Sequence, residues 1–164
     1  MKKYFIIVLL SITSSFAHSQ ELKKAYFAGG CFWCMEESFD QVDGVISTIS
    51  GYSGGHLKNP SYQDVIYKDT GHVEAIEITY DSKKINYEKL LDIYWKNIDP
   101  FDSAGQFCDK GKSYRSVIFF QTQLEKELIE KSFKKIEKLF NSKIVTLVWK
   151  FDKFYPDEDY HQDY

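Results

Sequence analysis

Gly29-Gly30-Cys31-Phe32-Trp33-Cys34-Met35-Glu36-Glu37 is the stretch at which a first strand is expected to turn into a first helix. An apolar, strand-like run, residues 25–28, precedes it, and the residues after it can continue as a helix to Phe39. Two glycines let the backbone turn sharply, so we expect Cys31 at the N-terminus of that helix. Unpaired N–H groups and the helix dipole favour a negative group there, so the position predicts a thiol that ionises readily. Cys31 is therefore a candidate nucleophile.

Cys34 follows three residues later, on roughly the same helical face, and could close a disulfide with Cys31. The Cys-x-x-Cys spacing also occurs as half of a zinc site or as two buried thiols. A structural zinc site needs four ligands, and the chain offers only Cys108 as a third cysteine. The pattern therefore favours redox or nucleophilic use. Phe32 and Trp33 between the thiols would form an apolar wall for a small apolar group, or belong to the core.

Length and charge limit the class of protein. A chain of 164 residues suits one domain with a single core. A net charge of -3 and the lack of a Lys/Arg block argue against a nucleic-acid partner. One compact domain of this kind is most simply a monomer.

The first residues have the composition of a secretory signal peptide. Lys2 and Lys3 precede an apolar run, residues 4–10, and Ala17-His18-Ser19 offers a small-x-small cleavage site. We therefore expect a signal peptide at 1–19, a single catalytic domain at 20–164, and export to the periplasm or beyond. The apolar run is too short for a bilayer and no cysteine follows the cleavage site, so no stable membrane insertion or lipid anchor is expected.

Strand and helix patterns alternate along the rest of the chain. Strands are expected at 21–27, 45–52, 72–80, 116–120 and 144–151, and helices at 31–39, 61–67, 87–97 and 123–140. Residues 98–115 read as a long loop, and 154–164 as an aromatic, acidic tail. The expected helices are enough to cover one face of a sheet, which predicts a two-layer α/β sandwich. Within the strand at 72–80, Glu74 would be buried or would line a pocket, unless it is an ordinary solvated strand residue.

Seven ordered motifs extend across the chain. They are Gly30-Cys31-Phe32-Trp33, Gly51-Tyr52-Ser53-Gly54-Gly55, Asn59-Pro60-Ser61-Tyr62, Gly71-His72-Val73-Glu74-Ala75, Gln106-Phe107-Cys108-Asp109-Lys110-Gly111, Tyr114-Arg115-Ser116, and Glu158-Asp159-Tyr160-His161-Gln162-Asp163-Tyr164. Together they resemble the A-type peptide methionine sulfoxide reductases, which act on the S epimer of methionine sulfoxide. The resemblance implies an α+β fold with a ferredoxin-like core, in which helices cover one side of a mixed sheet.

The resemblance also implies a reaction. The Cys31 thiolate would attack the sulfoxide sulfur while Glu74, kept protonated by an apolar site, protonates the oxygen. Cys31 would become a sulfenic acid, Cys34 would condense with it to a disulfide, and a thioredoxin-like donor would reduce that disulfide. Neither cofactor nor metal is implied. The substrates would be oxidised proteins or peptides, and free methionine sulfoxide remains an alternative.

Further roles come from the same resemblance. Tyr62, Tyr114 and Asp109 would hold the sulfoxide oxygen directly or through water, and Phe32 and Trp33 would hold the methyl group. Without the resemblance, the two tyrosines would be rim residues of the core and Asp109 a turn residue. His161 and His72 are left out of catalysis, because each is more simply a surface or hydrogen-bonding residue.

The chain departs from many relatives at the resolving thiol. Many carry glycine in place of Cys34 and a resolving cysteine near a longer C-terminus, whereas this chain stops at Tyr164 with no cysteine after Cys108. The resolving role therefore falls to Cys34. Cys108 could be a second resolving thiol or an inert neighbour of Asp109, and the inert reading is favoured because Cys34 is already within reach. The early end removes tail residues that often cover the site in relatives.

Two rival functions are compatible with the two thiols. A thioredoxin-like disulfide oxidoreductase would exchange disulfides with proteins and carry a cis-proline facing the pair, but Pro60, Pro100 and Pro156 lack the expected strand context. A non-catalytic protein would bind zinc tightly or form a disulfide that resists reduction. An exported redox pair would need a dedicated electron donor, because its compartment is oxidising.

Overall fold

The strand that ends at the paired glycines lies inside the sheet. The structure is a computed structural model that describes residues 19–162, so the predicted signal peptide lies outside the described residues apart from Ser19. β1 (Leu22–Gly29) pairs antiparallel with β3 (Val73–Asp81) on one side and with β6 (Ser116–Phe120) on the other. The turn that carries Cys31 is thereby fixed to two neighbouring strands.

The main sheet has six strands in the order β7-β6-β1-β3-β2-β8. β2 (Val45–Ser53) pairs antiparallel with β3, and β8 (Phe154–Pro156) pairs antiparallel with β2 at one edge. β7 (Leu147–Lys150) pairs parallel with β6 at the other edge, so the sheet is mixed. The inner order β6-β1-β3-β2, with helices after β1 and β3, is that of a ferredoxin-like core, and the predicted α+β class is confirmed.

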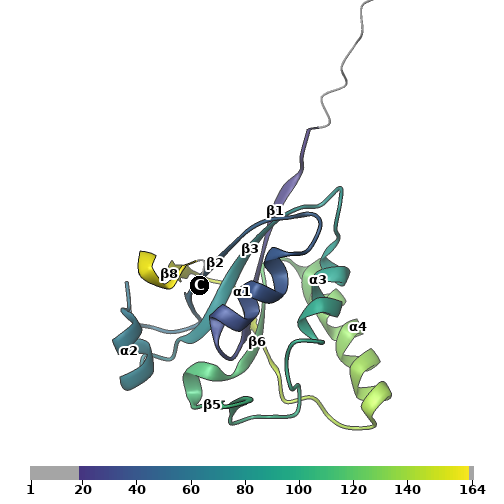
Figure 1. Cartoon of the computed structure of the whole chain (residues 1–164). Helices are drawn as coiled ribbons and strands as arrows, with labels where there is room; N and C mark the ends of the chain where they lie inside the picture. Colours follow the sequence, from purple (N-terminus) through teal and green to yellow (C-terminus); the bar gives the residue numbers. More distant parts are fainter. Residues whose placement is uncertain (1–18, 163–164) are drawn as a thin grey trace, which may run out of the picture.

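Three helices pack on one face of this sheet, in front of it in Figure 1. They are α1 (Phe32–Asp40), α3 (Tyr87–Tyr94) and α4 (Gln123–Phe140). The core between the layers joins Phe27 of β1 and Ile76 of β3, both fully buried, to Phe39 of α1 and Ile129 of α4. Burial of each such side chain contributes about 1.5–3 kcal/mol. α2 (Tyr62–Tyr67) lies in the connection between β2 and β3 and begins with a capping box at Ser61.

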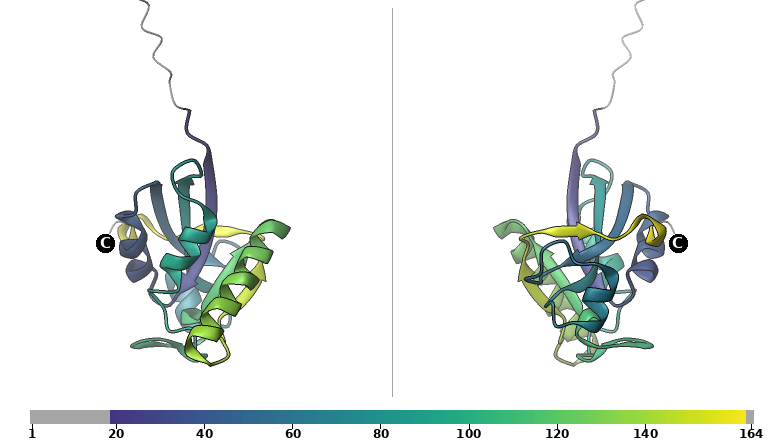
Figure 2. Two further views of the ribbon diagram at one scale, coloured as in Figure 1. Left: turned by 90° about the vertical axis from the view of Figure 1, so that its right-hand side faces the viewer. Right: turned by 90° about the vertical axis from the view of Figure 1, so that its left-hand side faces the viewer.

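A second, smaller cluster covers the opposite face of the sheet. Tyr26 of β1 and Phe119 of β6 are buried there against residues of β7 and the chain that follows it, including Trp149 and Phe151. Figure 2 shows this C-terminal segment, in yellow, crossing from the β7 edge of the sheet to the β2 edge. The crossing brings the segment around His161 to α1, where the Nε1–H of Trp33 donates to the carbonyl of His161.

Two segments contain structure that the sequence did not predict. The expected loop at 98–115 includes the two-residue strands β4 (Gly105–Gln106) and β5 (Asp109–Lys110) and the 3-10 helix η1 (Lys112–Tyr114). The tail, expected only to be aromatic and acidic, forms β8 and the 3-10 helix η2 (Asp159–His161). Elements of two or three residues are too short to show a periodic pattern in the sequence. β8 also depends on pairing with β2, which is distant in the sequence. No helix within 19–162 is both long and apolar enough to span a bilayer.

Candidate active site

Cys31 is the N-cap residue of α1, at the point where β1 has just ended. Gly30 makes the turn with φ of +87°, a left-handed conformation that favours glycine. A Cβ built on Gly30 would lie 2.6 Å from the Cβ of Gln106, so the β4 strand approaches the backbone beside the thiol. The side-chain amide of Gln106 in turn accepts from the N–H of Asp99 at 2.7 Å and donates to its carbonyl at 2.9 Å. This pair of bonds closes the segment 99–106, whose β4 strand lies against the turn at Gly30.

The ionisation of Cys31 differs from the sequence-based expectation. Burial raises the pKa of the half-buried Cys31 thiol to about 11, and the nearby charges of Cys34 and Glu74 act in the same direction. The backbone N–H groups of Cys34 and Trp33 lower this pKa, as a helix N-terminus should, but their effect is smaller than that of burial. The sequence therefore predicted correctly that the helix N-terminus lowers the pKa of Cys31. The prediction that Cys31 ionises readily was wrong, because burial raises this pKa by more. Cys31 is a protonated thiol at neutral pH in the free protein.

Glu74 is buried in β3 beside this thiol. The residue is only 2% exposed and shares the helix-facing side of the strand with Ile76 and Ile78. The N–H of Phe32, the residue after Cys31, donates to its Oε2 at 3.1 Å. Burial raises the pKa of Glu74 to about 8, and the charges of Asp109 and Asp157 add to the effect. A carboxylic acid that stays protonated at neutral pH therefore lies next to Cys31.

Tyr62 and Tyr114 come from different elements and meet beside Glu74. Tyr62 opens α2 and Tyr114 closes η1, and a hydrogen bond links their side chains. Burial raises the pKa of both hydroxyls, and the charge of Glu74 adds to each effect. Asp109 of β5 is close enough for its charge to raise the pKa of Glu74 and of Tyr114. The structure thus gathers these three predicted residues around the acid.

Aromatic rings lie near the thiol, two of them on the next two residues of the chain. Phe32 is 1% exposed, and its ring centroid lies 5.6 Å from that of Trp33 and 6.4 Å from that of Tyr62. The His161 ring meets Tyr62 edge-on at 4.9 Å and Trp33 edge-on at 5.5 Å. Trp33 is fixed by its Nε1–H, which donates to the carbonyl of His161 at 2.8 Å. The rings of Phe32, Trp33, Tyr62 and His161 thus form one cluster of ring contacts, which we call the ring pocket because we propose below that it receives the alkyl group of a substrate.

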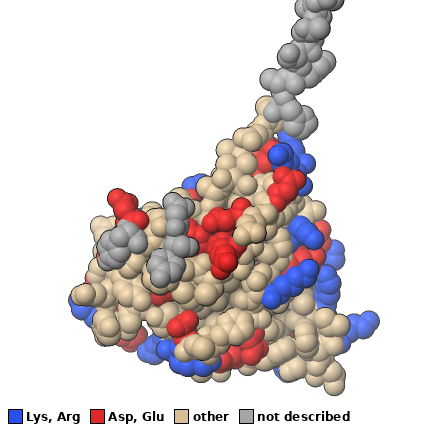
Figure 3. Space-filling model, viewed as in Figure 1, with Lys and Arg blue, Asp and Glu red and all other residues tan. Residues whose placement is uncertain are grey.

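Cys34 is exposed on the outer side of α1, and all three cysteines are free thiols. The exposed acidic residues Glu37 and Asp40 lie on the same helix, which has no basic residue. Figure 3 accordingly shows acidic side chains gathered over α1, whereas basic side chains lie mainly over α4. Cys108 is exposed at the turn between β4 and β5, directly before Asp109.

Three residues near the site were not selected from the sequence. Tyr52 of β2 pairs with Glu74 across the β2–β3 ladder, is fully buried, and places its ring 6.0 Å from that of Phe32. Asp157 and His161 reach the site from the C-terminal segment. Tyr52 and His161 lie within motifs of the resemblance, which could have drawn attention to them, whereas Asp157 carried no such signal.

His72 has a structural environment. Its Nδ1 accepts from the N–H of Gly55 at 3.1 Å, and its Nε2 lies 2.8 Å from the carbonyl oxygen of Leu57. These bonds hold the glycine-rich loop after β2. The expectation that His72 serves hydrogen bonding is consistent with these contacts.

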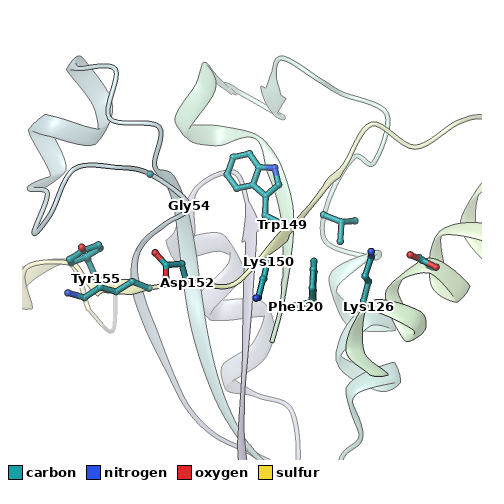
Figure 4. Close-up of a pocket in the computed structure, with 11 residues that line it drawn as sticks. Gly54, Phe120, Lys126, Trp149, Lys150, Asp152 and Tyr155 are labelled. Atoms are coloured by element: carbon teal, nitrogen blue, oxygen red, sulfur yellow. The ribbon is translucent and has the colours of Figure 1, made fainter. Parts of the chain in front are cut away.

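A separate groove of about 590 Å³ lies along the C-terminal crossing. Figure 4 shows Trp149 between Gly54 on one side and Lys126 on the other, with Lys150, Asp152 and Tyr155 along the groove. Its lining includes neither Glu74 nor any of the three cysteines. The groove is therefore distinct from the thiol site.

The comparisons with known proteins agree with one another. A family model described as peptide methionine sulfoxide reductase matches residues 23–164. A peptide methionine sulfoxide reductase MsrA of Listeria monocytogenes is 50% identical over 147 residues, which are 88% of this chain and 83% of that protein. The MsrA of Bacillus licheniformis is 49% identical over 150 residues, 90% of this chain and 82% of that one.

Solved structures show the same likeness in three dimensions. Reduced Mxr1 of Saccharomyces cerevisiae has a TM-score of 0.79 at 29% identity and covers 94% of this chain and 89% of its own. Methionine sulfoxide reductase A of Corynebacterium diphtheriae has a TM-score of 0.78 at 28% identity, covering 87% of this chain and 73% of its own.

Proposed function

The chain belongs to the peptide methionine sulfoxide reductase family of oxidoreductases, and from that premise we propose that it reduces the S epimer of methionine sulfoxide to methionine through Cys31, Glu74 and Cys34. The observation that carries the proposal is the buried Glu74 carboxyl, which accepts the N–H of Phe32 directly beside the Cys31 thiol. Thiol-dependent reduction is the family's chemistry; the residue roles and the epimer are our proposal.

Glu74 supplies the proton that the oxygen needs. An oxide that leaves sulfur without a proton is too basic, so a positioned acid is required as the S–O bond breaks. With a pKa of about 8, Glu74 holds its proton at neutral pH and can release it readily, close to the ideal for an acid working near that pH. The charges of Asp109 and Asp157 help to keep it protonated.

Cys31 supplies the electrons. Its sulfur forms a bond to the sulfoxide sulfur while the oxygen takes the proton of Glu74, and the thiol proton of Cys31 restores Glu74. The hydroxyl is then transferred from the substrate sulfur to the Cys31 sulfur: the substrate S–O bond breaks and a Cys31 S–O bond forms. The S–S bond breaks in the same step and its electron pair leaves with methionine, so Cys31 becomes a sulfenic acid. Thiol and sulfoxide thus become sulfenic acid and thioether, and atoms balance without an outside proton.

The ring pocket accounts for binding of the methyl group. Phe32 and Trp33 offer apolar faces beside Cys31, which suit a small alkyl group on sulfur. Tyr62 and Tyr114, next to Glu74, offer hydroxyl donors for the oxygen. An apolar side for the methyl group and a polar side for the oxygen would orient one epimer for attack, which supports selectivity for the S form.

Cys34 completes the turnover. Its thiol attacks the Cys31 sulfenic acid, a disulfide forms and water leaves; a dithiol donor of the thioredoxin type then reduces that disulfide. The yeast relative Mxr1 has been solved in complex with Trx2, which supports such a donor. Cys34 is exposed, so a donor can reach it, and the surface it would meet on α1 is acidic.

The compartment and the oligomeric state of the protein are also part of the proposal. Residues 1–19 would direct export, and residues 20–164 would act in the periplasm or outside the cell as a monomer on oxidised proteins or peptides. The support is the sequence of the first 19 residues alone. Cleavage near Gln20 would be seen as a shortened N-terminus in the exported protein.

The test is turnover of the two separated epimers of a methionine sulfoxide peptide with dithiothreitol. Wild type should reduce only the S epimer, and Cys31→Ser should be inactive. Cys34→Ser should still form one equivalent of methionine per protein in the absence of a reductant. If Cys31→Ser retains turnover, or if the wild-type protein reduces insulin disulfides and neither epimer, the proposal is wrong.

A further inference from the structure

Asp157 is a buried acidic residue whose only role in the proposed reaction is the effect of its charge on Glu74. Its side chain is 0% exposed, although the residue lies only a few positions from the end of the chain. A buried carboxylate is costly unless hydrogen bonds satisfy it. Here Oδ2 lies 2.5 Å from Nδ1 of His161, and Oδ1 accepts the N–H of Glu158 at 2.8 Å. The carboxylate is therefore held in place, and it holds His161.

The bond fixes the ring of His161 in two ways. Because a carboxylate accepts, Nδ1 of His161 carries the proton in this bond. The same bond prevents the imidazole from rotating away from Tyr62 and Trp33, which it meets edge-on at 4.9 Å and 5.5 Å. Without Asp157, the ring would lose this restraint.

The chain around Asp157 is itself anchored to β2. The N–H of Asp157 donates to the carbonyl of Ser50 at 3.0 Å. The amide of Gln162 accepts from the N–H of Ser50 at 2.9 Å and donates to its carbonyl at 3.0 Å. Both ends of the turn that carries His161 are thus tied to one strand residue. The backbone of His161 is fixed by these bonds, and only its side chain depends on Asp157.

We propose that Asp157 is a positioning residue, whose carboxylate holds the His161 imidazole as the closing wall of the ring pocket and so limits the size of the alkyl group on the sulfoxide sulfur. The inference rests on the proposed function, because the ring pocket must receive that alkyl group. The buried hydroxyl of Tyr52 lies near the same carboxylate on the sheet side.

The experiment compares two substrates, the S epimers of methionine sulfoxide and of ethionine sulfoxide, which has one more methylene on sulfur. Asp157→Ala should raise KM for the methionine compound about three- to tenfold, the range expected for a lost ring contact, with kcat changed less than twofold. The preference for methionine over ethionine, as a ratio of kcat/KM values, should fall at least threefold. Asp159→Asn, which removes an exposed charge from the same turn, is the matched control and should behave as wild type.

Three further variants separate positioning from a general loss of structure. If Asp157 acts through His161, the double variant Asp157→Ala/His161→Ala should show the same ratio as His161→Ala alone. Asp157→Asn keeps the side-chain size and replaces Asp157→Ala if the latter does not fold. In this variant, ¹⁵N chemical shifts of His161 should show that Nδ1 no longer holds the proton exclusively.

The outcomes are distinguishable. An unchanged substrate ratio in both Asp157→Ala and Asp157→Asn, or additive effects in the double variant, would overturn the positioning role while the reductase function stands. If wild type itself reduces neither sulfoxide, the proposed function fails, and this inference fails with it.

Discussion

Replacement of Glu74 by glutamine should stabilise the protein at alkaline pH. The carboxyl of Glu74 keeps its proton in the folded protein up to about pH 8, whereas in the unfolded chain it ionises near its ordinary pKa of 4.5. Between these values the unfolded state binds fewer protons, so the stability that the neutral acid contributes is fully present below pH 4.5 and is lost as pH rises through 8. At about 1.4 kcal/mol per pH unit, the loss amounts to at most about 5 kcal/mol.

Glutamine has nearly the same shape and does not ionise. The free energy of unfolding of Glu74→Gln, relative to wild type, should therefore increase by up to about 4 kcal/mol between pH 5 and pH 9, with most of the rise complete near pH 8. Urea unfolding at several pH values measures this difference directly. Glu37→Gln, at an exposed position of α1, reports any effect of the same substitution outside the site. A difference that stays constant within about 1 kcal/mol from pH 5 to pH 9 would show that Glu74 is not a buried neutral acid.

Other predictions concern the acid, the turn and the third thiol. Infrared spectra of wild type should contain a protonated carboxylic acid band that disappears as pH rises through about 8 and is missing in Glu74→Gln; its persistence in the variant would assign the band to another group. Glu74→Gln should also lose about 10²- to 10⁴-fold in kcat, and a smaller loss in a turnover assay would mean that another group protonates the oxygen. Gly30→Ala should cost about 1–3 kcal/mol in thermal unfolding, because φ is +87° and its Cβ would meet Gln106 at 2.6 Å; a wild-type Tm would contradict the close approach. Cys108→Ser should form the Cys31–Cys34 disulfide at the wild-type rate in a single-turnover thiol assay, and a slower rate would make Cys108 a resolving thiol.

The main elements of the fold could be predicted because their patterns are local. The helix at 123–140 was predicted at its observed bounds, since its apolar spacing is a local pattern. The strand alternation around Glu74 likewise placed that residue in β3. The turn at Gly30 was predictable because only glycine tolerates its conformation.

The electrostatics of the site could not be read in the same way. The charge state of Cys31 depends on a balance between N–H groups, which the local sequence reveals, and burial, which only the assembled fold sets. Asp157 is a related case, because its neighbour Ser50 is more than one hundred residues away in sequence. A tail rich in acidic residues gives no sign that one of them turns inward to a histidine.

The two edge strands of the sheet are short, and this affects how the protein meets other chains. β7 has four residues and ends at Lys150; β8 has three and ends at Pro156, which has no N–H to offer. Short edges that carry lysine or proline resist pairing with a strand from another molecule. A protein proposed to repair oxidised, partly unfolded chains would work among many exposed strands. These edges would let it release such chains after repair, where a long free edge would collect them into aggregates.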